Sequence, residues 1–178
     1  MKGKSYRDGG QYTYAFYNNP TWSGFGYIVI DATMVALPGV PNVRGGYRAV
    51  GSLIDRSAYL KTALQKRVKS YSELRNMDPP DLTAPGGSWE RHHIIAGKYA
   101  NKYNSTYNNM PCIFTPKAWH TKITSKQGGM SSTLNGEQAA QAHVNAYTQL
   151  AQNAADDSER AFWEWNKLWC QTFIERTY

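Results

Sequence analysis

Three of the four histidines in this chain, His92, His93 and His120, lie in one short segment. Histidine is the commonest metal ligand and the side chain best suited to proton transfer near neutral pH. Neighbouring residues of an extended strand point to opposite faces, so His92 and His93 can act differently. One of them can hold a metal ion while the other faces a water molecule, which is the division of roles that metal-assisted hydrolysis requires.

The residues around these histidines predict four consecutive elements. The predicted order is a strand, a polar loop, a second strand and a helix, at Trp89–Ile95, 96–108, Met110–Phe114 and 117–126. Thr115 is a favourable helix N-cap, and Pro116 suits the first helical position because its missing N–H costs nothing there. A strand and a helix in contact can bring His92 and His120 together around one ion.

Three short patterns in this segment resemble the HNH, or ββα-metal, nucleases. They are Glu-Arg-His-His at 90–93, Asn109, and Thr-Pro-Lys-Ala-Trp-His at 115–120. The closest resemblance is to the nuclease colicins and to the HNH toxin domains of bacterial polymorphic toxins. It covers about a fifth of the chain and implies a small ββα-metal motif within a mainly helical α+β domain.

The resemblance implies a role for each matching position. His92 and His120 would be metal ligands, and His93 would be the general base. Glu90 would support the geometry of the site, while Asn109 would pin the loop and help to orient the base. Asn108 is an alternative to Asn109, because the spacing to the helix histidine is slightly longer here than in the family.

The third metal ligand is the main departure from the family pattern. Nuclease colicins have a further histidine one helical turn after the position of His120, and this chain has Thr124 there. The fourth histidine, His143, is either that third ligand or a hydrogen-bonded core residue on an apolar helix face. Two histidines with waters would suit Zn, Ni or Mn better than Mg, because imidazole favours the former metals.

The charge balance is compatible with a nucleic-acid substrate. The chain has 178 residues, with 20 Lys and Arg against 13 acidic residues, a net charge of +7 and a pI near 9.4. Such an excess favours nucleic acid, an acidic protein or an anionic surface as partner. Four lysines surround the motif, and each could contact phosphate or be merely solvated: Lys98, Lys102, Lys117 and Lys122.

The rest of the sequence predicts one compact unit after a helical N-terminal region. Apolar residues at three- and four-residue steps predict a long helix over 47–74, and the breaker-rich segment 76–88 predicts a linker. Two helices are expected to close the chain, at about 136–151 and from Asp156 onward, where Asp156 and Glu159 form a variant capping box. The predicted organisation is therefore 1–75, a linker at 76–88, and the nuclease motif with its C-terminal helices at 89–178.

The first 42 residues give weaker indications. Loops and a short strand at 11–17 are expected, then an apolar run at 27–37 and a turn at 38–42. The segment 29–42 is similar to segments that precede toxin domains in Rhs-type effectors. Residues 1–10 show no conventional signal peptide, and no apolar run is long enough to span a bilayer.

Cys112 and Cys170 are expected to be reduced core thiols, although a single disulfide remains an alternative.

Together these features predict a metal-dependent DNA endonuclease that acts as an antibacterial toxin. The resemblance further implies secretion without a conventional signal peptide, action in the cytoplasm of a target cell, and an acidic cognate immunity protein. An RNase on the same scaffold is the first alternative, and a non-catalytic basic module with a structural zinc is the second. A thiol enzyme using Cys112 is the least favoured alternative, because an apolar run stabilises a thiolate poorly.

Overall fold

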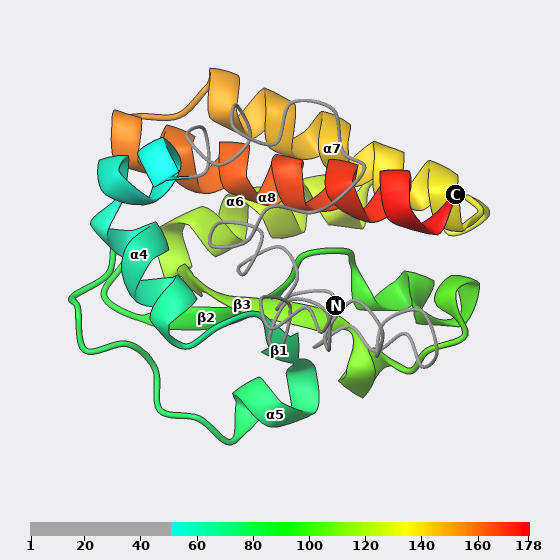
Figure 1. Ribbon diagram of the computed structural model, residues 1–178, viewed down its shortest axis with the longest axis horizontal. Coiled ribbons are helices and arrows are strands. Elements are labelled where there is room, and N and C mark those ends of the chain that lie inside the picture. The colour runs from blue at the N-terminus through cyan, green and yellow to red at the C-terminus, as the bar shows by residue number, and fades with distance from the viewer. Residues whose placement is uncertain (1–50) are drawn as a thin grey trace, which may run out of the picture.

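The computed structural model describes residues 51–178 (Figure 1). The short strand predicted at 11–17, the apolar run at 27–37, the turn at 38–42 and the effector-like segment at 29–42 lie outside the described residues. No helix within 51–178 has the length and apolar character needed to cross a membrane.

The described part is a mainly helical α+β structure, as predicted. After a helical segment at 51–56, its elements are α4 Ala58–Gln65, β1 Lys69–Ser70, α5 Tyr71–Arg75, β2 Trp89–His93, the 3₁₀ helices η1 Gly97–Tyr103 and η2 Tyr107–Asn109, β3 Pro111–Pro116, α6 Lys117–Gly128, α7 Gly136–Gln152 and α8 Asp157–Thr177. The strands form one antiparallel sheet in the order β1-β3-β2. The predicted order of strand, loop, strand and helix is therefore present at 89–128.

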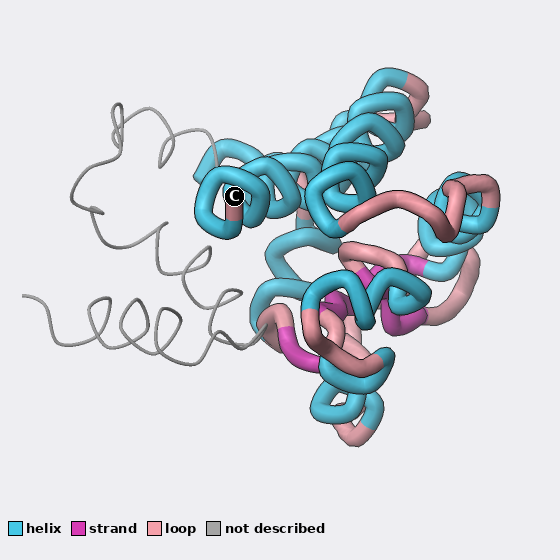
Figure 2. The backbone as a smooth tube through the Cα atoms, turned by 90° about the vertical axis from the view of Figure 1, so that its right-hand side faces the viewer, coloured by secondary structure: helices cyan, strands magenta, loops and turns pink. Residues whose placement is uncertain are grey.

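The two C-terminal helices form an antiparallel pair on one side of the sheet. In Figure 1, α7 and α8 run side by side above the strands, and α5 lies below them. Seen from the side in Figure 2, the strands lie between helical segments. Each long helix begins where the sequence predicts, because Asn135 and Asp156 accept hydrogen bonds from the backbone N–H groups of Gln138 and Glu159.

The prediction of one continuous helix over 47–74 is wrong for its described part. Ser57 ends the first helical segment and N-caps α4, and Arg67 adopts a left-handed φ of 66° that ends the run. Ser70 then begins α5 with a capping box to Glu73. The periodic apolar residues still face the core, but β1 pairs with β3, so this region shares the sheet and core of residues 89–178.

The predicted N-cap of α6 is also wrong. Thr115 is the fifth residue of β3, and its buried hydroxyl has no hydrogen-bond partner among residues 51–178. Helix α6 starts at Lys117 without a side-chain cap from that part of the chain. Instead, the N–H groups of Lys117 and Ala118 donate to the carbonyls of Ser88 and Pro85. The loop before β2, which contains no helix or strand at 76–88, thus replaces a capping side chain.

A single aromatic-rich core joins the helices to the sheet. Trp119 of α6 is 4% exposed and packs against Tyr59, Phe162 and Trp163. It is therefore a core residue and is not available to stack on a base. Both cysteines are buried free thiols, as expected, and burial raises the pKa of each well above 9.0.

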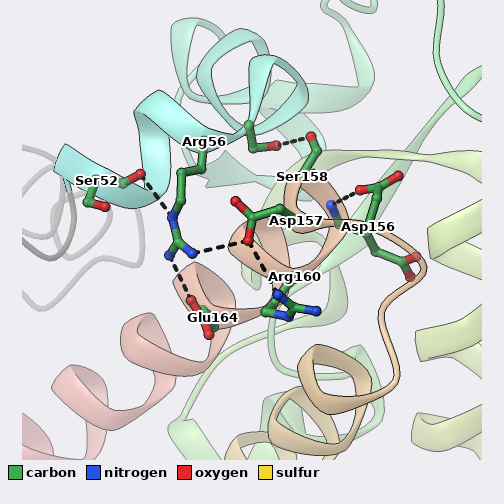
Figure 3. A network of polar contacts seen from close by, with 9 residues as sticks. Ser52, Arg56, Asp156, Asp157, Ser158, Arg160 and Glu164 are labelled. Carbon is green, nitrogen blue, oxygen red and sulfur yellow. Dashed lines mark hydrogen bonds and ion pairs between the residues drawn. The ribbon is translucent and has the colours of Figure 1, made fainter.

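Two groups of ion pairs connect α8 to the rest of the fold. Arg56 reaches Asp157 at 3.3 Å and Glu164 at 3.0 Å across exposed surface (Figure 3). By contrast, the carboxylate of Glu159 is almost fully buried and lies 2.7 Å from the amine of Lys122 on α6. Exposed pairs add little stability. The Lys122–Glu159 pair is buried only on its carboxylate side, because the lysine side chain is 42% exposed and solvent screens it in part.

Candidate metal and proton-transfer site

The two adjacent histidines of β2 point to opposite faces of the sheet, as predicted. His92 pairs with Ile113 of β3, and its ring approaches α6 and α7. His93 pairs with Cys112, and its ring stacks on Tyr71 of α5 at 5.0 Å between ring centres. The strand therefore separates the two side chains while keeping their backbones adjacent.

His92 is fully buried and has one unpartnered nitrogen. Its Nε2 lies 2.7 Å from the hydroxyl of Tyr147 on α7, whereas its Nδ1 has no hydrogen-bond partner within the described part of the chain. Burial lowers the pKa of His92 well below 6.5, and the nearby His120, His93 and His143 lower it further. The ring is therefore neutral at pH 7, which is the form that binds metals.

The ring of His120 lies close to the ring of His92, at a separation compatible with two ligands of one metal ion. The ring centres of His92 and His120 are 5.5 Å apart. Two histidines that bind one zinc ion tetrahedrally, at about 2.0–2.1 Å from nitrogen to metal, have ring centres about 5 Å apart. Burial lowers the pKa of His120, and the Glu90 carboxylate raises it. Glu90 therefore lies close enough to act on His120 electrostatically, from the same face of β2 as His92.

No third protein ligand is in place within residues 51–178. No group of three or more His, Cys, Asp or Glu side chains there is arranged to hold a metal ion. Thr124 lies one turn after His120, with its hydroxyl oxygen 3.4 Å from Nε2 of that histidine. The described residues therefore offer two imidazoles as candidate donors, and solvent or substrate oxygens would supply the remaining ligands of a bound ion.

His93 is oriented by a hydrogen bond to a backbone carbonyl. Its Nε2 lies 3.1 Å from the carbonyl oxygen of Tyr107, which can only accept, so Nε2 carries the proton. Nδ1 is then the basic nitrogen of the neutral ring. The Tyr71 ring lies along one face, and the Tyr107 ring meets the histidine edge-on at 4.4 Å. Burial lowers the pKa of His93, the Tyr107 carbonyl raises it, and His120 lowers it.

The asparagine of the predicted motif lies two residues after Tyr107, whose carbonyl orients His93. Asn109 ends the 3₁₀ helix that begins at Tyr107, and its backbone N–H donates to the Thr106 carbonyl. Both Asn108 and Asn109 are exposed. The contact with His93 comes from the backbone of Tyr107, so the geometry places Asn109 in the turn that supplies the carbonyl.

His143 has no nitrogen left for a metal. Its Nδ1–H donates to the Ala139 carbonyl at 2.7 Å, and its Nε2 accepts the N–H of Ala96 at 2.9 Å. Burial lowers its pKa to about 4, the Ala139 carbonyl raises it, and Lys98 lowers it further. His143 occupies the core arrangement that was the alternative to a ligand role.

The four lysines near the motif divide into two kinds. Lys98 donates to the carbonyls of Gln127 and Met130, and Lys122 pairs with the buried Glu159. Lys102 and Lys117 are exposed. The first pair therefore stabilises the fold, and the second pair remains available to an anionic ligand.

Sequence reasoning missed Tyr147, Tyr71 and the Tyr107 carbonyl. Tyr147 has a usable signal, because it follows His143 by four residues on the predicted apolar face of a helix, where the two side chains lie one above the other. Tyr71 and the Tyr107 carbonyl have no such signal in the sequence, because a stacked ring and a backbone oxygen depend on tertiary contacts.

Comparisons of the chain with protein-family models, curated proteins and solved structures found no match.

Proposed function

We propose that this protein is a metal-dependent endonuclease that hydrolyses the phosphodiester bonds of DNA. One observation carries the proposal: at the end of β2, a buried histidine with a free nitrogen faces a second histidine, and the next residue is an oriented neutral histidine. These are a candidate metal pair and a candidate general base on one rigid strand. The resemblance of residues 90–120 to HNH nucleases favours the same chemistry.

His93 would carry out the proton transfer. Nδ1 removes a proton from a water molecule as the water oxygen attacks phosphorus and the bond to the 3′-oxygen breaks. The Tyr107 carbonyl accepts from Nε2–H, so it keeps the ring in the basic tautomer and stabilises the imidazolium that forms. The stacked Tyr71 ring restricts rotation of the imidazole.

His92 and His120 would hold a divalent metal ion, and Zn, Ni, Mn and Mg are the candidates. When bound, the ion supplies stabilisation of negative charge on the phosphate and on the departing 3′-oxygen. Glu90 acts on His120 through its charge. Lys102 and Lys117 are exposed and do not take part in the fold contacts made by Lys98 and Lys122, so they could contact flanking phosphates.

The wider biological role follows from the same resemblance and belongs to the proposal. The protein would be an antibacterial effector delivered by a secretion system and active in the cytoplasm of the target cell. A cell that makes such an enzyme needs an inhibitor, and the net charge of +7 favours an acidic immunity protein.

The test is cleavage of plasmid DNA and total RNA, incubated separately with Zn, Ni, Mn or Mg. Wild-type protein is expected to degrade the plasmid with at least one metal. His93→Ala should reduce the rate by roughly 10²–10⁴-fold, the usual contribution of a general base. Thr121→Ala is the control, because Thr121 is exposed beside His120 and bonds only to the backbone of its own helix.

The same assay separates the alternatives. Cleavage of RNA alone would replace DNA by RNA as the substrate. Stoichiometric zinc with no cleavage of either polymer would favour the non-catalytic module. If wild type and His93→Ala are equally inert with every metal, the nuclease proposal is wrong.

A further inference from the structure

A buried tyrosine hydroxyl controls which nitrogen of His92 is free. The Tyr147 hydroxyl lies 2.7 Å from His92 Nε2 and 2.7 Å from the carbonyl oxygen of Ile94. A carbonyl only accepts, so the single hydroxyl proton is directed to Ile94. The hydroxyl oxygen must then accept from His92, which places the imidazole proton on Nε2.

The opposite nitrogen is left with an unused lone pair. Nδ1 of His92 is buried and has no partner within the described residues. An unsatisfied buried acceptor costs free energy, of order 1–3 kcal/mol, so its presence in an otherwise well-bonded site calls for a ligand. The ring centre of His120 lies 5.5 Å from the ring centre of His92, so a second imidazole is close by.

We propose that Tyr147 is the positioning residue that holds His92 in the Nε2–H tautomer and thereby selects Nδ1 as the metal-binding atom. The inference rests on the proposed metal-dependent function and adds a residue to it. A histidine ligand commonly donates its other N–H to an oxygen acceptor, which fixes the tautomer and the ring orientation. Here that acceptor is a phenol whose own proton is tied to the backbone two residues after the ligand.

The helix α7 makes this arrangement rigid. His143 lies one turn before Tyr147 and accepts the N–H of Ala96, while Tyr147 donates to the carbonyl of Ile94. Two side chains of one helix face therefore bind the backbone that directly follows β2. Tyr147 is fully buried and its ring also stacks on Trp163, so the hydroxyl has little freedom to turn away.

The first experiment measures the wild-type protein, and a single variant serves only to assign the signals. In the metal-free full-length protein, ¹⁵N shifts of the His92 ring should show a protonated Nε2 and an unprotonated Nδ1, with the signals assigned by their loss in His92→Gln. Added zinc should shift the Nδ1 signal. A protonated Nδ1, or a zinc-induced shift at Nε2 in its place, overturns the inference.

The second experiment removes the hydroxyl. Tyr147→Phe should give a mixture of the two His92 tautomers and weaken zinc binding by roughly 10- to 100-fold in calorimetric titrations. Tyr99→Phe is the matched control, because Tyr99 is also buried and donates to a backbone carbonyl, that of Ser131. In Tyr99→Phe, the tautomer of His92 and the affinity for zinc should equal those of the wild-type protein. An unchanged tautomer and affinity in Tyr147→Phe overturns the inference.

These results are independent of cleavage. A protein that cuts no nucleic acid but shows the expected tautomer and zinc dependence supports the role of Tyr147 and contradicts the nuclease proposal. An active nuclease whose zinc affinity is unaffected by Tyr147→Phe supports the nuclease proposal and overturns the role of Tyr147.

Discussion

In the resemblance to the nuclease colicins, Thr124 stands where that family has a further ligand histidine. Its hydroxyl oxygen lies 3.4 Å from Nε2 of His120, so the backbone already directs this side chain toward the candidate site. Residues four apart on a helix are neighbours on one face. At the residue scale, the lack of a histidine at position 124 is therefore a difference in side chain only. The helix already places this position on the same face as His120.

Thr124→His is expected to tighten zinc binding by about tenfold or more, since a third imidazole adds a ligand that suits zinc. Isothermal titration with zinc measures the change. Thr121→His is the control, because Thr121 follows His120 directly, is exposed and does not share its face. Equal affinity in the two variants would mean that position 124 does not face the metal.

The His93 environment shows how a backbone atom can take a role that sequence reasoning gives to a side chain. The resemblance assigns Asn109 to orient the base, but the hydrogen bond comes from the carbonyl of Tyr107, within the same 3₁₀ turn. A substitution at Asn109 acts on this bond only through the conformation of the turn.

At the element scale, α6 depends on the loop that precedes β2. Gly86 has φ +85°, and a Cβ atom there would lie 2.7 Å from the backbone nitrogen of Ala118 in α6. Gly87 has φ +82°, but a Cβ atom there would meet nothing within 4 Å. The two glycines therefore share the same left-handed backbone and differ only in their contact with the helix.

Gly87→Ala is expected to lower the free energy of unfolding by about 1 kcal/mol, the cost of a left-handed alanine. Gly86→Ala should lower it by at least about 2 kcal/mol, because it also pushes the loop away from the N–H groups that it caps. Urea denaturation of both variants measures the difference. Equal losses would show that the close approach of loop and helix contributes nothing to stability.

At the scale of the whole molecule, burial of His143 makes stability depend on pH. The pKa of this histidine falls from 6.5 to about 4 on folding. Above about pH 6.5 the ring is neutral in both states, so its two hydrogen bonds contribute fully. As the pH falls from 6.5 toward 4, the unfolded chain takes up a proton that the folded protein excludes, and the free energy of unfolding decreases.

Between pH 7.5 and pH 5.0 this histidine alone should remove about 2 kcal/mol from the free energy of unfolding. His143→Gln retains an acceptor for the Ala96 N–H but does not titrate, so its stability should fall by about 2 kcal/mol less over the same interval. Carboxylates titrate equally in both proteins and cancel in the comparison. Parallel pH dependences in wild type and variant would contradict the prediction.

Local sequence was sufficient for the elements whose ends carry their own signals. The caps Asn135 and Asp156 mark the starts of α7 and α8, and the breakers of 76–88 mark a segment without helix or strand. Local sequence was insufficient at Ser57 and Arg67, where the helix is interrupted but the apolar periodicity continues. The periodicity continues because the successive short elements face the same core. Periodicity reports which face is buried, and it does not report continuity.

The residue types and spacing by themselves determined that His92, His93 and His120 are the candidate site and that His92 and His93 face opposite ways, since strand geometry is local. Only the tertiary structure decided which nitrogen each ring presents. Tyr147, His143 and the Tyr107 carbonyl reach these positions from distant elements or from backbone atoms. A side chain's identity sets what chemistry it can perform, but its proton and its free lone pair are set by hydrogen-bond partners that only the folded chain brings together.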